Sequence, residues 1–249
     1  MEKQPTMTAA RSKGSSKATP AANRQTRSKA APTPVSAYHH GNLRNALIVE
    51  GRRLLETLGA HELSLRHVAR SVGVSIAAPS HHFDGKEGLL AAIAAEGFRE
   101  LAVLRREIVG GTTDPLNRLY RMMECYVRFA EREKGLFNLM VGPRILERDA
   151  YEELTAAGTV SFDLFADAVC DYARSQGWQA KDLELVVHAA WSVEHGLATL
   201  ILAGRIPRYD RSKINVAQVV DFSLAMLMSA VASGPANLSR TARLMRRGA

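Results

Sequence analysis

The sequence predicts an all-α protein, because hydrophobic residues recur at helical spacing from Tyr38 onward and no segment alternates as a strand would. Glycine and proline interrupt these runs at intervals typical of helix ends. Composition is the third observation: 46% of the 249 residues are hydrophobic, which is enough to form a core. A chain of this length suits one large domain or two domains of unequal size.

The first helix is predicted from the spacing of its leucines. Leu43, Leu47, Leu54 and Leu58 fall on one helical face, and Gly59 ends the run. A second, short helix is expected to begin after residue 64, with its apolar side turned inward. The protein therefore starts its folded part with two consecutive helices.

The second and third helices have the spacing of a helix-turn-helix. Ser64 can cap the second helix, and Gly73 breaks it with the positive φ that a sharp turn requires. Ser75 can cap a third helix that extends to about His82, with Pro79 near the end of its first turn, where proline costs less than in mid-helix. In a helix-turn-helix the second of the two helices enters the DNA major groove, which is about 12 Å wide and admits one helix.

Start and stop signals define the remaining helices. Asp84 and Glu87 have the spacing of a capping box, and the helix that follows is expected to reach Val109 before Gly110-Gly111. Asp114-Pro115 marks the next start. Further helical runs are predicted at roughly 115–131, 133–141, 149–176, 182–203 and 213–232.

The last two helical runs have almost no polar face. A helix that is apolar all round must be buried all round. The body of the chain is too small to bury two such helices easily, so a second copy in a two-fold dimer is the simplest cover. The alternative is that one of the two is a central core helix. The dimer interface is expected to include His195, Gly196, Leu200, Leu224 and Leu227.

Positive charge is concentrated in the two ends of the chain. The net charge is +8, yet residues 1–37 contain seven lysines or arginines against one glutamate, and residues 234–249 contain four arginines and no acidic residue. Both segments are predicted to be disordered basic tails. Such arms often contact nucleic acid through phosphates, but a merely solubilising role is an equal alternative.

Several classes of protein are excluded by what the sequence lacks. Two cysteines, Cys125 and Cys170, are too few for a disulfide framework and suit a reducing cytoplasm. The sequence shows no signal peptide, no continuous apolar membrane span, no phosphate-binding loop and none of the common hydrolase or dinucleotide motifs. We expect a cytoplasmic protein that is not an enzyme, needs no cofactor and has no membrane partner.

Four motifs together resemble the tetracycline-repressor (TetR) family. They are Tyr38–Arg44, Leu65–Ala69, Gly73–Phe83 and Lys86–Leu90, which agree with the family in order and spacing. A weaker resemblance lies further along: Gly135–Met140 and Trp191–Gly196 are similar to the WHG-type C-terminal domain found in part of that family.

The resemblance implies about nine helices in two functional parts. Residues 38–88 would form the DNA-binding domain, and residues 89–233 would form the effector-binding and dimerisation domain. The residues that match the family's DNA-contacting positions are Ser64, Arg66, Ser75, Ile76, Ala77, Ala78, Ser80, His81, His82 and Lys86. Among these, Ser80 departs from the family, which usually has tyrosine there. Because the reading helix is also short of Arg, Asn and Gln, we expect DNA shape and backbone contacts to share the recognition.

A ligand pocket in the C-terminal half is expected to be apolar. Its candidate residues are Met122, Tyr126, Phe129, Phe137, Met140, Phe162, Phe165 and Trp191, which could equally be plain core. Six of the eight histidines lie near the helix-turn-helix, but their spacing favours hydrogen bonding over a metal site. His188 and His195, with Glu194 adjacent, favour hydrogen-bonded core over a ligand site. No metal is therefore predicted.

The sequence as a whole predicts a DNA-binding transcriptional regulator. The expected partners are double-stranded DNA with a palindromic operator, a second copy of the chain, and a hydrophobic small-molecule effector that releases a repressor. A non-specific architectural DNA-binding protein is the alternative, but it leaves the long apolar C-terminal half unexplained. An enzyme is the least favoured class.

Overall fold

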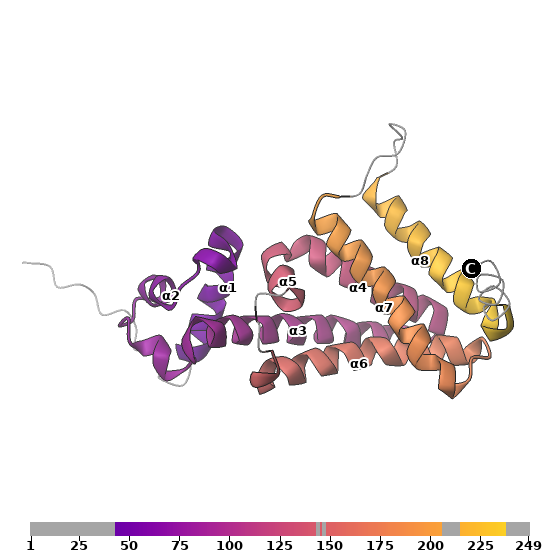
Figure 1. Cartoon of the computed structure of the whole chain (residues 1–249), viewed down its shortest axis with the longest axis horizontal. Helices are drawn as coiled ribbons and strands as arrows, with labels where there is room; N and C mark the ends of the chain where they lie inside the picture. Colours follow the sequence, from indigo (N-terminus) through magenta and orange to yellow (C-terminus); the bar gives the residue numbers. More distant parts are fainter. Residues whose placement is uncertain (1–42, 143–144, 146–147, 206–214, 238–249) are drawn as a thin grey trace, which may run out of the picture. The chain divides into compact units, whose positions relative to one another are not determined.

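The computed structural model describes residues 43–142, 145, 148–205 and 215–237. In this part of the chain every regular element is a helix and no strand occurs (Figure 1). The elements are α1 (Leu43–Glu62), α2 (Leu65–Val72), η2 (Ala78–His81), α3 (Gly85–Gly111), α4 (Pro115–Arg132), α5 (Lys134–Val141), η3 (Arg148–Ala150), α6 (Glu152–Ser175), α7 (Ala180–Leu202) and α8 (Val216–Ala232). The predicted all-α fold class is confirmed.

The two basic tails predicted at 1–37 and 234–249 lie outside the described residues, apart from 234–237. The described helices belong to one unit of the chain, His39–Ala249. The disorder expected of both tails stays a prediction.

Helix α3 links the two functional parts expected from the sequence. It starts beside α2 and η2 and then packs along α6, as Figure 1 shows. Its first half, from Leu89 to Ala95, is buried on all sides between α1, α5 and α6. One core cluster joins α1, α2, α3 and α5 and extends to residues of α4, α6 and α7, and a second joins α4, α6, α7 and α8. The expected domain boundary at residue 88 falls inside α3 and stays a prediction.

The third predicted helix is shorter and tighter than expected. Instead of an α-helix from Ser75 to His82, the chain forms a turn followed by the 3-10 helix η2. Pro79 has no amide hydrogen, so it cannot donate the α-helical bond to the Ser75 carbonyl. The amides of Ala78, Ser80 and His82 instead bond three residues back, as in a 3-10 helix.

The helix ends confirm some local signals and correct two, since Ser75 does not cap the third helix, whose N-cap is Ala77 without a side-chain hydrogen bond. Asp114 caps α4 as predicted, because its carboxylate accepts the Asn117 amide at 2.8 Å and Pro115 occupies the first turn. The capping box predicted at Asp84 is wrong: the Asp84 side chain makes no capping hydrogen bond. Gly85 has φ +63°, and Asp84 has ψ 87°, so the carboxylate is not in the usual N-cap orientation.

Helix α7 is as apolar as the sequence predicts. Among the described helices it is the one long and apolar enough to cross a membrane, judged by length and composition alone. A helix in a protein core passes the same test, and α7 packs against α4, α6 and α8.

Candidate DNA interface and effector site

The helix-turn-helix is built around Gly73. This residue has φ 80° and ψ 28°, and its amide donates to the carbonyls of Ala69 and Arg70 at 3.0 and 3.2 Å. The Val74 amide also returns to Ala69, at 3.0 Å, so the carbonyls at the end of α2 are satisfied within the turn. Ser64 caps the other end of α2, with its hydroxyl accepting the His67 amide at 3.2 Å. The chain thereby turns sharply from α2 into η2.

The residues predicted to contact DNA lie close together in the chain and are mostly on the surface. Arg66, Ser75, Ile76, Ala77, Ser80 and His81 are exposed, whereas Ser64, Ala78, His82 and Lys86 are partly buried. Pro79 is buried, and Phe83, two residues after η2, is buried in the hydrophobic core, which holds the end of η2 in place. Ile76 is the one large apolar side chain in the exposed set, and it is 51% exposed. The turn and η2 therefore present a small, largely uncharged surface.

Two of these residues make hydrogen bonds that the sequence did not predict. The Lys86 ammonium donates to the His61 carbonyl at 2.6 Å, which ties the start of α3 to the end of α1. The Ser80 hydroxyl donates to the Ala77 carbonyl at 2.7 Å. Its oxygen can therefore only accept a hydrogen bond from another molecule. The DNA-contacting roles of both residues stay predictions.

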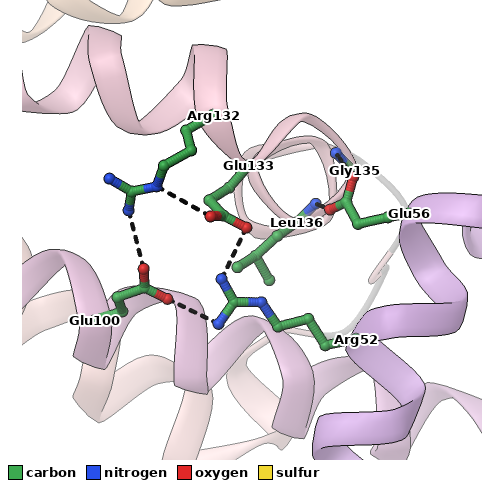
Figure 2. A network of polar contacts seen from close by, with 7 residues as sticks. All are labelled: Arg52, Glu56, Glu100, Arg132, Glu133, Gly135 and Leu136. Atoms are coloured by element: carbon green, nitrogen blue, oxygen red, sulfur yellow. Dashed lines mark hydrogen bonds and ion pairs between the residues drawn. The ribbon is translucent and has the colours of Figure 1, made fainter.

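Helix α1 is joined to the C-terminal helices by a network of charged side chains (Figure 2). The Arg52 guanidinium bonds Glu100 of α3 and Glu133, each at 2.8 Å. Arg132 of α4 bonds the same two carboxylates at 3.0 Å. Burial raises the pKa of Glu133, but the hydrogen bonds from Arg52 and Arg132 outweigh burial and hold that pKa below its usual value. Four alternating charges thus connect three helices.

The same joint includes a cap supplied by a distant helix. Glu56 of α1 accepts the amides of Gly135 and Leu136 at 3.1 and 2.9 Å, which are among the unpaired amides at the start of α5 (Figure 2). The negative carboxylate also complements the positive end of the helix dipole. A Cβ on Gly135 would lie 2.9 Å from the Glu56 carboxylate, so only glycine allows this approach. We call Arg52, Glu56, Glu100, Arg132 and Glu133 the α1–α5 joint.

The close approach at Gly135 makes a testable prediction. Gly135→Ala is expected to destabilise the protein by about 0.5–2 kcal/mol, because the added methyl group must displace the exposed Glu56 carboxylate and break its cap on α5. Gly110→Ala is the matched control: a Cβ there meets no atom within 4 Å, so the change should be neutral or slightly stabilising in the helix. Urea denaturation of both variants measures the difference, and equal midpoints would contradict the proposed tightness of the joint.

A buried charged pair lies at the centre of the C-terminal helices. Arg105 of α3 and Glu194 of α7 have side chains only 3% and 1% exposed, and their Nη2 and Oε1 atoms are 3.2 Å apart. Arg105 Nη1 also donates to the carbonyl and the hydroxyl oxygen of Ser161 in α6, at 2.6 and 3.2 Å. The guanidinium carbon lies 5.4 and 5.3 Å from the ring centroids of Tyr126 and Phe165. Four helices therefore surround one buried cation.

A chain of polar and aromatic contacts leads from this pair toward the surface. The Tyr126 hydroxyl and His195 Nδ1 are hydrogen-bonded at 3.0 Å. The His195 ring stacks on Trp191 with centroids 5.3 Å apart, and Trp191 is 39% exposed. Phe137 of α5 meets the Tyr126 ring edge-on at 5.1 Å. We call Arg105, Tyr126, Glu194, His195 and Trp191 the polar core.

The eight residues predicted to line an effector pocket are divided by the structure. Met122, Tyr126, Phe129, Phe137, Met140 and Phe165 are buried, Phe162 is partly buried and Trp191 is exposed. Tyr126 and Trp191 belong to the polar core, Phe137 and Phe165 contact it, and Phe162 contacts the Trp191 ring at 6.3 Å. Their role in effector binding stays a prediction. A separate surface pocket of 550 Å³, between α3 and α6, is lined by none of the eight.

Sequence reasoning missed Arg105 and Ser161 and treated Glu194 only as a neighbour of His195. A lone arginine in a long helix is usually solvent-exposed, and nothing local distinguishes Arg105. The one available signal was Glu194, an acidic residue within an otherwise apolar helix, where an inward-facing charge requires a partner.

The predicted dimer residues fall into different environments. Leu200 is exposed, and Gly196 has open space beside its Cα. His195 turns inward to Tyr126, and Leu227 is partly buried. Leu224 is fully buried in the core of its own chain, so in this conformation it offers no surface to a partner. Besides Leu200, the large exposed apolar side chains of α7 and α8 are Leu185, Trp191, Val216, Phe222 and Met226.

No group of three metal-ligating side chains gathers within the described ranges. His39 and His40 lie outside those ranges. Burial raises the pKa of both free thiols, Cys125 and Cys170, so neither is activated as a nucleophile.

Two family models match the chain, one over each of the two expected functional parts. The model described as "Bacterial regulatory proteins, tetR family" matches residues 47–93, and "Tetracyclin repressor-like, C-terminal domain" matches residues 119–227. A solved protein of unknown function from a Rhodococcus species is 30% identical to this chain. Its match covers 80% of this chain and 100% of that one, with a TM-score of 0.68. This chain belongs to the TetR family.

Two further TetR-family structures share the fold at lower identity. The transcriptional regulator PfmR from Thermus thermophilus is 19% identical, with 74% of this chain and 97% of that chain covered and a TM-score of 0.52. A TetR/AcrR-family regulator from Thermobifida fusca is 17% identical, with 75% and 97% covered and a TM-score of 0.54. None of the curated proteins compared with this chain matches it. As a TetR-family protein, the chain is a DNA-binding transcriptional regulator.

Proposed function

We propose that this TetR-family regulator is a homodimeric repressor that a small molecule releases from a palindromic operator. In this proposal residues 38–88 bind DNA, residues 89–233 bind the effector and the partner subunit, and the protein acts in the cytoplasm. The observation that carries the proposal is the α1–α5 joint, which connects the DNA-binding end directly to helices of the polar core.

The route of coupling runs through α5. Phe137 of α5 packs on Tyr126, which belongs to the polar core. Two residues earlier, the start of α5 is held by Glu56 of α1. Because α1 packs against α2, a shift of α5 is carried to the helix-turn-helix. An effector that favours one position of α5 therefore favours one orientation of the DNA-binding surface.

The dimer is proposed from the exposed apolar faces of α7 and α8. Phe222 and Met226 of α8 are 68% and 61% exposed, and Leu185 and Leu200 of α7 are also on the surface. An apolar surface of this kind on two adjacent helices is typical of a homodimer interface. Two subunits would place their η2 elements about one DNA turn apart, roughly 34–36 Å, or a multiple of it.

Selection from random DNA tests the operator. The full-length protein should enrich a palindrome whose half-sites are separated by whole helical turns, because a two-fold dimer presents two identical reading surfaces. A single asymmetric site would contradict the dimeric mode of binding. Equal affinity for the enriched and the random DNA at physiological salt would favour the architectural alternative.

The exposed arginine at the start of α2 gives a second test of the DNA interface. Arg66→Ala should weaken binding to all sequences alike and lower the slope of log K against log salt by about one, because one phosphate contact is lost. Arg174→Ala, at the exposed end of α6, is the matched control and should leave the slope unchanged. Filter binding or anisotropy over a salt series measures both, and an unchanged Arg66→Ala slope would remove this residue from the interface.

A further inference from the structure

The buried pair of the polar core leaves two polar atoms unused. Among the described residues, Arg105 Nε and Glu194 Oε2 are buried and have no hydrogen-bond partner. Buried polar atoms are almost always hydrogen-bonded, so such exceptions require an explanation, and an unseen ligand or water is a common one. Replacing a buried ion pair by apolar side chains is often neutral or stabilising, so stability alone does not explain why this pair is present.

The two unused atoms belong to one small region. Arg105 Nη1 is bonded to Ser161, and Nη2 is bonded to Glu194 Oε1. In a planar guanidinium, Nε–H and one Nη2–H point from the same edge, which fits the two oxygens of a carboxylate side by side. Glu194 engages only the Nη2 half of that edge, with one of its oxygens. The Nε half is left for an acceptor from another molecule.

The charge of this region favours an anion. Burial raises the pKa of Glu194 to about 8, in spite of Arg105, so at neutral pH this carboxyl is mostly protonated and its free oxygen can donate. Arg105 stays charged. The other titratable groups around the pair are neutral, because burial raises the pKa values of Cys125 and Tyr126 and lowers that of His195. One unneutralised cation therefore remains in an apolar surrounding.

The geometry points to an amphipathic organic carboxylate as the effector, with its carboxylate on Arg105 Nε and Glu194 Oε2 and its apolar body among Tyr126, Phe137 and Trp191. The inference rests on the proposed effector-controlled function and replaces a purely hydrophobic effector by one with an acidic head. Trp191 marks the side of entry, because it is exposed and is linked by His195 and Tyr126 to the buried pair.

Matched probes test this class of ligand on the full-length protein. Octanoate and 3-phenylpropanoate are compared with octan-1-ol and octylamine, in thermal melts and by Trp191 fluorescence in a Trp178→Phe background, since the chain has only two tryptophans. Both acids should bind saturably, and at least about tenfold more tightly than the alcohol, as expected for a charge-assisted hydrogen bond. Equal binding of acid and alcohol, or no binding of either acid up to about 10 mM, would overturn the inference.

Substitutions assign the binding to the pair. Arg105→Met should weaken octanoate binding by about 10- to 100-fold, because the cation is removed. Arg106→Met, its exposed neighbour, is the matched control and should bind octanoate as the unmodified chain does. Circular dichroism checks folding, and Arg105→Met binding octanoate normally would show that the acid sits elsewhere.

A second variant keeps the test decisive even where Arg105→Met folds poorly. Octanoate affinity of the unmodified protein should fall as pH rises through about 8, because Glu194 then ionises beside the bound carboxylate. Glu194→Gln should bind octanoate with little dependence on pH over this range, since its side chain stays neutral. A flat profile in the unmodified protein, or the same fall in Glu194→Gln, would contradict the inference. It would indicate that a buried water, and not a carboxylate, lies beside Arg105 Nε and Glu194 Oε2.

Release of DNA is measured separately, so that the two proposals fail independently. Arg105-dependent binding of octanoate without release of the selected operator would keep the carboxylate site and remove the proposed mode of control. Specific operator binding with no response to either acid would keep the DNA-binding function and remove the carboxylate site.

Discussion

Replacing Phe222 and Met226 together by glutamate should convert the protein to a monomer and weaken operator binding by about 100-fold or more. The two side chains are the most exposed large apolar residues of α8. Four charges in the two-fold interface would oppose one another without partners. A dimer that binds both half-sites at once also gains about 10²–10⁴ in avidity, which a monomer loses.

The matched control for this double variant is Val103→Glu. Val103 is 50% exposed on α3, so the same kind of charge replaces an exposed valine away from α7 and α8. Sedimentation equilibrium gives the oligomeric state, and gel-shift titration of the selected operator gives the affinity. A double variant that stays dimeric would mean that another surface joins the subunits, and the faces of α7 and α8 would need a different occupant.

The second large effect concerns the two halves of the buried pair. Glu194→Leu should destabilise the protein by about 3–5 kcal/mol, because it removes the carboxyl oxygen that accepts a hydrogen bond from the buried guanidinium, and arginine cannot lose its proton. Arg105→Met should cost less, about 1–3 kcal/mol, because the remaining carboxyl can stay protonated and neutral. The pKa of Glu194 should rise further in that variant, since Arg105 is one of the groups that lower it.

The double variant separates pairing from packing. Arg105→Met with Glu194→Leu should return to within about 1 kcal/mol of the unmodified protein, because no unpaired charge remains. Urea denaturation at one protein concentration measures all four proteins, so that dimerisation contributes equally. Additive costs in the double variant would show that each residue matters for its shape and not for its charge.

The pH dependence of stability follows from the same residue. The pKa of Glu194 is raised in the folded state, so the stabilisation it provides is complete below the carboxyl's ordinary pKa and is lost as pH rises toward about 8. This fall should be absent in Glu194→Gln.

Local signals predicted the helices well, because caps and glycine turns act within a few residues. Ser64, Gly73 and Asp114 bond to atoms three or four residues away, and each has the role expected from the sequence. Pro79 is also a local signal. Because it lacks an amide hydrogen, the 3-10 helix η2 forms in place of the predicted α-helix.

Contacts between residues that are far apart in the chain could not be predicted from the sequence. Arg105 is separated from Ser161 and Glu194 by 56 and 89 positions, and only the packing of α3 against α6, and of α6 against α7, brings them together. Glu56 caps α5 from 79 positions away for the same reason. Apolar residues occur on every face of α8, so their spacing does not indicate which face is buried. It could not be predicted that Leu224 faces the core and Phe222 faces outward.

Pro79 also bears on the thermodynamics of operator recognition. Its ring fixes one backbone angle of η2 before any DNA is present, and the residue is buried. Helix η2 therefore loses little conformational entropy when it binds operator DNA, in contrast to a segment that folds only on binding its partner. Most of the heat-capacity change on association should then come from desolvating the groove and the protein surface, and little from ordering η2.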